Sequence, residues 1–121
     1  MNSINLIGRL TRDPELRTTS DESSVAVLRL AVPRRRGGED AGAVFVNVVC
    51  FARQAEAAGE YLYKGRRVAV VGRLEHREWT DPGGELRSRH EVVAEHLEFL
   101  DARHRPGADV AGAAQADGDA A

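Results

Sequence analysis

Cysteine is almost missing from this chain of 121 residues, in which Cys50 is the only one. One cysteine excludes an intramolecular disulfide and any metal cage built from cysteine thiolates. Because Cys50 stands among valines, we interpret it as a small buried hydrophobic side chain. The sequence also shows no signal-peptide pattern and no membrane-spanning run of ~18 apolar residues. We therefore expect a cytoplasmic protein with no membrane partner.

Lysine is nearly absent as well, because Lys64 is the only one among the 17 basic residues. The positive charge is thus carried by arginine, whose planar guanidinium group can stack as well as form ion pairs. Residues 1–80 hold 13 basic and 10 acidic side chains, whereas residues 81–121 hold 4 and 9. The formal net charge of −2 by itself indicates no polyanionic partner, but it hides this asymmetry.

The motifs of common enzyme classes are missing too. No Gly-Lys-Ser/Thr phosphate loop occurs, and the serines cluster without a nearby histidine. His90 and His96 are six residues apart. A helix would turn them to different sides, and a strand would hold them on one face but too far apart for one ion. We predict no metal site and no catalytic site, and the sequence does not indicate an enzyme.

The stretch Ala43–Phe51 alternates as a β-strand does, with successive side chains on opposite faces. One face is aliphatic and suits a hydrophobic core; it carries Val44, Val46, Val48 and Cys50. The other face carries Phe45, Asn47, Val49 and Phe51. This second face holds two of the few aromatic residues. It is either another buried surface or a platform on which flat ligands stack.

Hydrophobic periodicity predicts five strands and one helix. The strands are expected at residues 3–12, 25–32, 43–51, 68–74 and 86–100, and the fourth could run on to Trp79. The helix is expected at residues 53–63, followed by Lys64 and Gly65 as a C-terminal stop signal. Polar and glycine-rich loops are expected at 18–24 and 34–38.

This order of elements predicts the fold class. Three strands, one helix and two strands is the order of the OB-fold, an all-β five-stranded Greek-key barrel with a helix between strands 3 and 4. We assign residues 1–102 to this domain. Residues 103–121 are mostly Ala, Gly and Asp, so we expect a disordered tail there.

Sequence-independent binding to nucleic acid single strands needs aromatic faces for the bases and basic groups for the phosphates. The candidate stacking residues are Phe45, Phe51 and Trp79, with Asn47 between the two phenylalanines. The candidate phosphate contacts are Arg34, Arg35, Arg36, Arg53, Lys64, Arg66, Arg73 and Arg77. The alternative is that the aromatic residues are structural and the arginines form an ordinary solvated surface.

Four segments resemble bacterial single-stranded DNA-binding proteins: residues 5–17, 60–65, 70–74 and 79–81. The similarity covers roughly residues 1–101. The resemblance implies a homotetramer of OB-folds that wraps single-stranded DNA in replication, recombination and repair, without catalysis or a cofactor. It also implies stacking at Phe45, Phe51 and Trp79, a dimer edge near Asn2–Gly8, and a location at the nucleoid. Replication or repair proteins are further expected partners.

Three departures from the family pattern concern DNA and protein contacts. Arg36 lies near a position that is often aromatic, and Glu75 and Glu78 stand where basic residues are common. The end of the chain, residues 118–121, lacks the family's acidic tip with its proline and phenylalanine, which favours a specialised paralogue. Two rival functions stay open: an RNA-binding OB protein, and a primosomal-type accessory subunit acting mainly through protein contacts.

Overall fold

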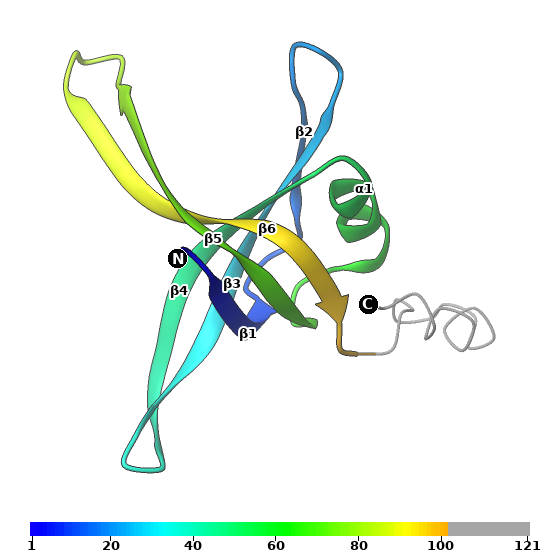
Figure 1. The fold of residues 1–121 in the computed structure, drawn as a ribbon, viewed down its shortest axis with the longest axis vertical. Helices are drawn as coiled ribbons and strands as arrows, with labels where there is room; N and C mark the ends of the chain where they lie inside the picture. Colours follow the sequence, from blue (N-terminus) through cyan, green and yellow to red (C-terminus); the bar gives the residue numbers. More distant parts are fainter. Residues whose placement is uncertain (102–121) are drawn as a thin grey trace.

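The computed structural model describes residues 1–101, which form a strand-rich barrel with one helix at its side (Figure 1). The elements in chain order are β1 (Ile4–Leu10), β2 (Glu15–Thr18), β3 (Ser24–Arg36), β4 (Glu39–Phe51), α1 (Ala52–Tyr61), β5 (Arg67–Thr80) and β6 (Leu86–Phe99). The tail predicted for 103–121 lies outside the described residues. Within residues 1–101, no helix is long and apolar enough to cross a membrane.

Five long strands close the barrel. Strand β1 pairs antiparallel with β5 along its length and with β3 at Arg9 and Leu10. Strand β4 pairs antiparallel with β3 and parallel with β6 at Val48 and Val49. The ring β1-β3-β4-β6-β5, with α1 between β4 and β5, confirms the predicted OB-fold. The four-residue β2, which pairs with the outer edge of β3, is an addition that the sequence pattern did not predict.

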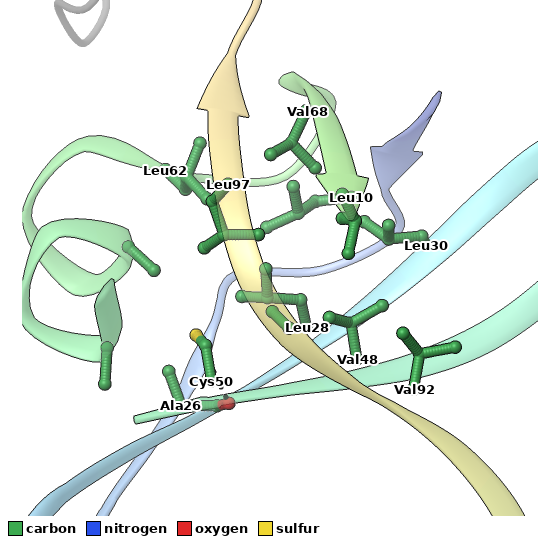
Figure 2. Close-up of a cluster of buried hydrophobic side chains, with 14 of the residues drawn as sticks. Leu10, Ala26, Leu28, Leu30, Val48, Cys50, Leu62, Val68, Val92 and Leu97 are labelled. Atoms are coloured by element: carbon green, nitrogen blue, oxygen red, sulfur yellow. Dashed lines mark hydrogen bonds between the residues drawn. The ribbon is translucent and has the colours of Figure 1, made fainter. Parts of the chain in front are cut away.

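The barrel interior is filled by aliphatic side chains from all five strands and from the segment after α1, as Figure 2 shows. On β4, the prediction of a core face is confirmed for Val48 and Cys50, which are fully buried. Burial raises the pKa of the Cys50 thiol to about 12. Val44 is exposed instead, because the β3–β4 hairpin extends beyond the barrel, at the bottom of Figure 1.

Two predicted element ends are wrong. Arg34, Arg35 and Arg36 belong to strand β3 rather than to a loop, and the turn is made by Gly37 and Gly38 at positive φ. Helix α1 ends at Tyr61 with Leu62 as its C-cap, so Lys64 lies beyond the last turn. Gly65 instead sits at positive φ in the following turn, where its N–H donates to the Leu10 carbonyl at 2.8 Å.

A β-bulge interrupts the pairing of β5 with β6. Val71 faces His96 whereas Gly72 faces Ala94, so Glu95 is the extra residue. A Cβ atom at Gly72 would lie 2.3 Å from the Val93 carbonyl oxygen, and this close approach requires glycine. The bulge inverts the alternation of β6. His90 and His96 therefore lie on opposite faces, not on the single face that an uninterrupted strand predicts.

Candidate nucleic-acid interface

The aromatic face of β4 is an exposed surface and not a second core. Phe45 and Phe51 are 56% and 47% exposed, so the alternative that both are core residues is wrong. Between them, Val49 is buried and Asn47 is half-buried. The register with β3 places Ala31, Arg29 and Val25 directly beside Phe45, Asn47 and Phe51. Two ring faces thus stand on one antiparallel strand pair, with five residues of β4 between them.

Asn47 orients an arginine beside the first ring. The Arg29 Nη1 donates a hydrogen bond to the Asn47 Oδ1 at 3.1 Å. The guanidinium carbon of Arg29 lies 5.6 Å from the centroid of the Phe45 ring. Because both partners come from directly paired positions of β3 and β4, their geometry is set by the sheet. Asn47 thus contributes by holding Arg29.

The β5–β6 hairpin carries a second aromatic–arginine pair. Trp79 is 39% exposed and lies next to the last residue of β5. The guanidinium carbon of Arg89 lies 5.4 Å from the Trp79 ring centroid. Arg87, directly opposite Trp79, donates from Nε to the Asp81 Oδ2 at 2.9 Å. That hydrogen bond lowers the pKa of Asp81 and ties the hairpin turn to β6.

A groove of about 140 Å³ joins the outer faces of β3 and β4 to the base of this hairpin. Its lining comes from five strands and the β1–β2 loop: Arg12, Glu15, Arg17, Val25, Val27, Asn47, Val49, Arg77, Arg89 and Glu91. Four arginines against two glutamates make the groove electropositive, and the valines form an apolar floor. An anionic chain with flat apolar groups fits these properties.

Several arginines near the groove are already engaged with carboxylates. Arg73 is bonded from Nε to Glu75 at 2.8 Å and from Nη1 to Glu95 at 3.5 Å. The hydrogen bond to Glu75 raises the pKa of Arg73. Arg77 is ion-paired to the buried carboxylate of Glu91 at 3.7 Å. Phosphate contact by Arg73 or Arg77 would therefore compete with these internal pairs.

The remaining predicted basic residues are scattered. Arg34, Arg35 and Arg36 are exposed near the tip of the β3–β4 hairpin, and Arg53 is exposed in the first turn of α1, two residues after Phe51. The structure does not gather them into the groove, which none of them lines.

Lys64 and Arg66 lie far from Trp79, because they precede β5 and Trp79 is near its other end. Eleven strand residues lie between Arg67 and Trp79, which corresponds to about 40 Å measured along the strand. Lys64 is exposed, but Arg66 is only 4% exposed. The guanidinium group of Arg66 lies 5.0 Å from the Tyr63 ring and 4.0 Å from the Asp101 carboxylate. Burial against these groups does not fit the prediction of Arg66 as a phosphate contact.

Four arginines of the surface were missed by the sequence reasoning: Arg12, Arg17, Arg29 and Arg89. For Arg29 a signal existed, since it is the one charged residue in the apolar stretch 25–32 and shares strand parity with Val25 and Val27. Arg89 meets Trp79 only through the register of β5 with β6, which no local pattern reveals.

A sequence model of the single-strand binding protein family matches residues 1–100. The single-stranded DNA-binding protein of Wolinella succinogenes is 42% identical over 106 residues, covering 84% of this chain and 65% of that protein. That of Helicobacter hepaticus is 40% identical over 106 residues, covering 84% and 62%. That of Thermotoga maritima is 45% identical over 104 residues, covering 83% and 74%. The chain thus spans slightly less than two thirds of the length of the first two relatives.

The family match takes in the closed barrel, both projecting hairpins and the strands that line the groove. It covers 100 of the 121 residues, and the alignment with the Wolinella succinogenes protein covers 84% of this chain. The resemblance seen in the four sequence segments is therefore confirmed over the whole barrel. The chain belongs to the single-strand binding protein family.

Proposed function

We propose that this protein binds single-stranded DNA without sequence preference, and that it does so on the outer face of β3, β4, β5 and β6. The observation that carries the proposal is the pairing of an exposed aromatic ring with a nearby arginine at two places on that face, Phe45 with Arg29 and Trp79 with Arg89. Rings stack on any base, and arginines attract any phosphate, so neither contact selects a sequence.

Phe51 extends the proposed path beyond the groove. It is exposed at the end of β4 and directly paired with Val25. A second base, further along the DNA strand than the one on Phe45, can stack there. Arg34, Arg35, Arg36 and Arg53 provide charge at the two ends of this path. We leave Arg66 out of the site because it is buried.

The protein acts as a binding protein and not as an enzyme, as its family membership supports. We propose that it protects single-stranded DNA during replication, recombination and repair at the bacterial nucleoid. The names of the relatives favour DNA over the two rivals, an RNA-binding OB protein and a primosomal-type accessory subunit. Competition between oligo-dT and oligo-U of equal length tests this, and preferential retention of RNA would contradict it.

We also propose that the protein assembles into tetramers built from dimers, and that the two chains of each dimer pair at the edge near Asn2–Gly8. Strand β1 pairs with β5 from Ile4 to Arg9 but meets β3 only at its last two residues, which leaves its other edge open over Ile4–Gly8. Ile7 on this strand is exposed. Light scattering should give four chains per particle, and the variant Ile7→Asp should lower that number. A monomeric wild-type protein would refute this assembly.

Salt should weaken binding in proportion to the phosphates contacted. For single strands the slope of log affinity against log salt is about −0.7 per neutralised phosphate. We expect Arg89→Gln to make the slope shallower by about 0.7, the contribution of one contact. The matched control is Arg67→Gln, because Arg67 lies at the far end of β5 and is bonded to Asp101. Fluorescence anisotropy with labelled oligo-dT measures both slopes.

If the affinity of the wild type does not change with salt concentration, arginine–phosphate contacts make no contribution to binding. Equal changes in Arg89→Gln and Arg67→Gln would instead remove Arg89 from the site.

A further inference from the structure

Two histidines face each other across the β5–β6 hairpin, outside the proposed DNA path. His76 is directly paired with His90 in the register of the two strands. Their ring centroids are 4.8 Å apart with an interplanar angle of 31°, and both side chains are exposed. Strand alternation places them on the hairpin face opposite to Trp79 and Arg89. The pair is therefore accessible and is not used by the nucleic-acid interface.

The separation of the two rings matches the distance that one bound ion requires. Transition-metal ions such as Zn²⁺ bind imidazole nitrogen at about 2.0–2.1 Å, which puts each ring centroid about 3.2 Å from the ion. Between a right angle and a tetrahedral angle at the metal, the two centroids then stand about 4.5–5.2 Å apart. The observed 4.8 Å lies inside this interval. Rotation of the two side chains would direct one nitrogen of each ring to a shared point.

We propose that His76 and His90 form a two-histidine chelate for a divalent transition-metal ion. Neutral imidazole is a preferred ligand of Zn²⁺, Cu²⁺ and Ni²⁺. No group of three or more His, Cys, Asp or Glu residues within 1–101 is arranged to hold a metal, so water completes the coordination. Glu78 lies two residues from His76 on the same strand face, about 7 Å along β5, and its negative charge favours a cation there.

A metal ion at this position would cross-link the strands that carry Trp79. The hairpin projects from the barrel, at the upper left of Figure 1. Its two strands are held together mainly by the backbone hydrogen bonds between them. An ion bound to both strands stabilises the paired state and leaves the Trp79 face open, because the chelate lies on the other face. Metal binding and DNA binding are therefore independent, and either one can fail without the other.

Copper titration of the tag-free full chain tests the site, because bound Cu²⁺ quenches nearby indole emission and Trp79 is the only tryptophan. We expect saturable quenching with one Cu²⁺ per chain, and calorimetry with Zn²⁺ should give the same stoichiometry. His76→Gln and His90→Gln should each lower the affinity by about tenfold or more, since even changes behind a metal ligand reduce affinity by that factor.

The control variant is His96→Gln, which removes an exposed histidine of β6 beyond the bulge and should bind metal as the wild type does. Thermal unfolding adds an independent readout. Zn²⁺ should raise the unfolding temperature of the wild type and of His96→Gln, but not of the other two variants. Affinity that is unchanged in both His76→Gln and His90→Gln would overturn the proposal. So would affinity that falls equally in all three variants.

Discussion

Replacement of Trp79 by alanine should weaken binding to oligo-dT by about 5- to 150-fold, which corresponds to the roughly 1–3 kcal/mol that one stacked base contributes. The indole is exposed at the end of β5 and contacts the Arg89 guanidinium group. Its removal therefore takes away the proposed stacking face and the ring beside Arg89, the proposed phosphate contact, but opens no cavity in the barrel. Fluorescence anisotropy with labelled oligo-dT measures the change.

The matched control is Leu86→Ala on the same hairpin. Leu86 is more exposed than Trp79, is paired with Thr80, and lies on the other hairpin face by strand alternation. We expect its affinity to equal that of the wild type and both variants to unfold at the wild-type temperature. If Trp79→Ala binds as tightly as Leu86→Ala, the hairpin has no part in stacking. Phe45→Ala then becomes the decisive variant for β4.

The substitution Gly72→Ala should destabilise the fold by about 2 kcal/mol or more, in the upper part of the range for overpacked positions. The new Cβ atom would lie 2.3 Å from the Val93 carbonyl oxygen and 3.0 Å from its carbon. These are backbone atoms of the adjacent strand, so no side-chain rotation relieves the overlap. The strands must separate at the bulge. Thermal unfolding should show a midpoint about 10 °C lower.

Gly83→Ala is the control for this prediction. Gly83 lies in the β5–β6 turn, where an added Cβ would meet only the Asp81 Oδ1 at 3.4 Å, an ordinary contact. Its unfolding midpoint should stay close to that of the wild type. An unchanged midpoint for Gly72→Ala would mean that the bulge does not hold the two strands at the described separation.

The order of the long elements was predictable because each depends on a local pattern. The apolar alternation of Val44 to Cys50, the alanine-rich helix and the turn at Asp81–Gly84 identify the barrel order without any knowledge of tertiary contacts. Strand β2 was not predictable, since its four residues, of which only Leu16 is apolar, show no usable period. The extent of β3 was also missed, because three successive arginines resemble a loop although the ladder continues through them.

The candidate site was only partly predictable. Phe45, Phe51 and Trp79 were identified from residue type and strand parity, but only the structure decides between burial and exposure for the two phenylalanines. The partners Arg29 and Arg89 depend on the registers of separate strand pairs. For Arg66 the prediction failed in the other direction. A charged residue next to a strand suggests a solvent-exposed side chain, but packing against Tyr63 buries it.

The most direct test of the account is a titration of the wild-type protein with oligo-dT of increasing length, followed by the emission of its only tryptophan. We predict strong, saturable quenching at low salt, with a stoichiometry in nucleotides that reports the site size. The quenching should be reversed by added salt, because the phosphate contacts are electrostatic. Absence of binding at low salt would contradict the account. Binding seen by anisotropy with unchanged Trp79 emission would contradict the proposed location of the DNA.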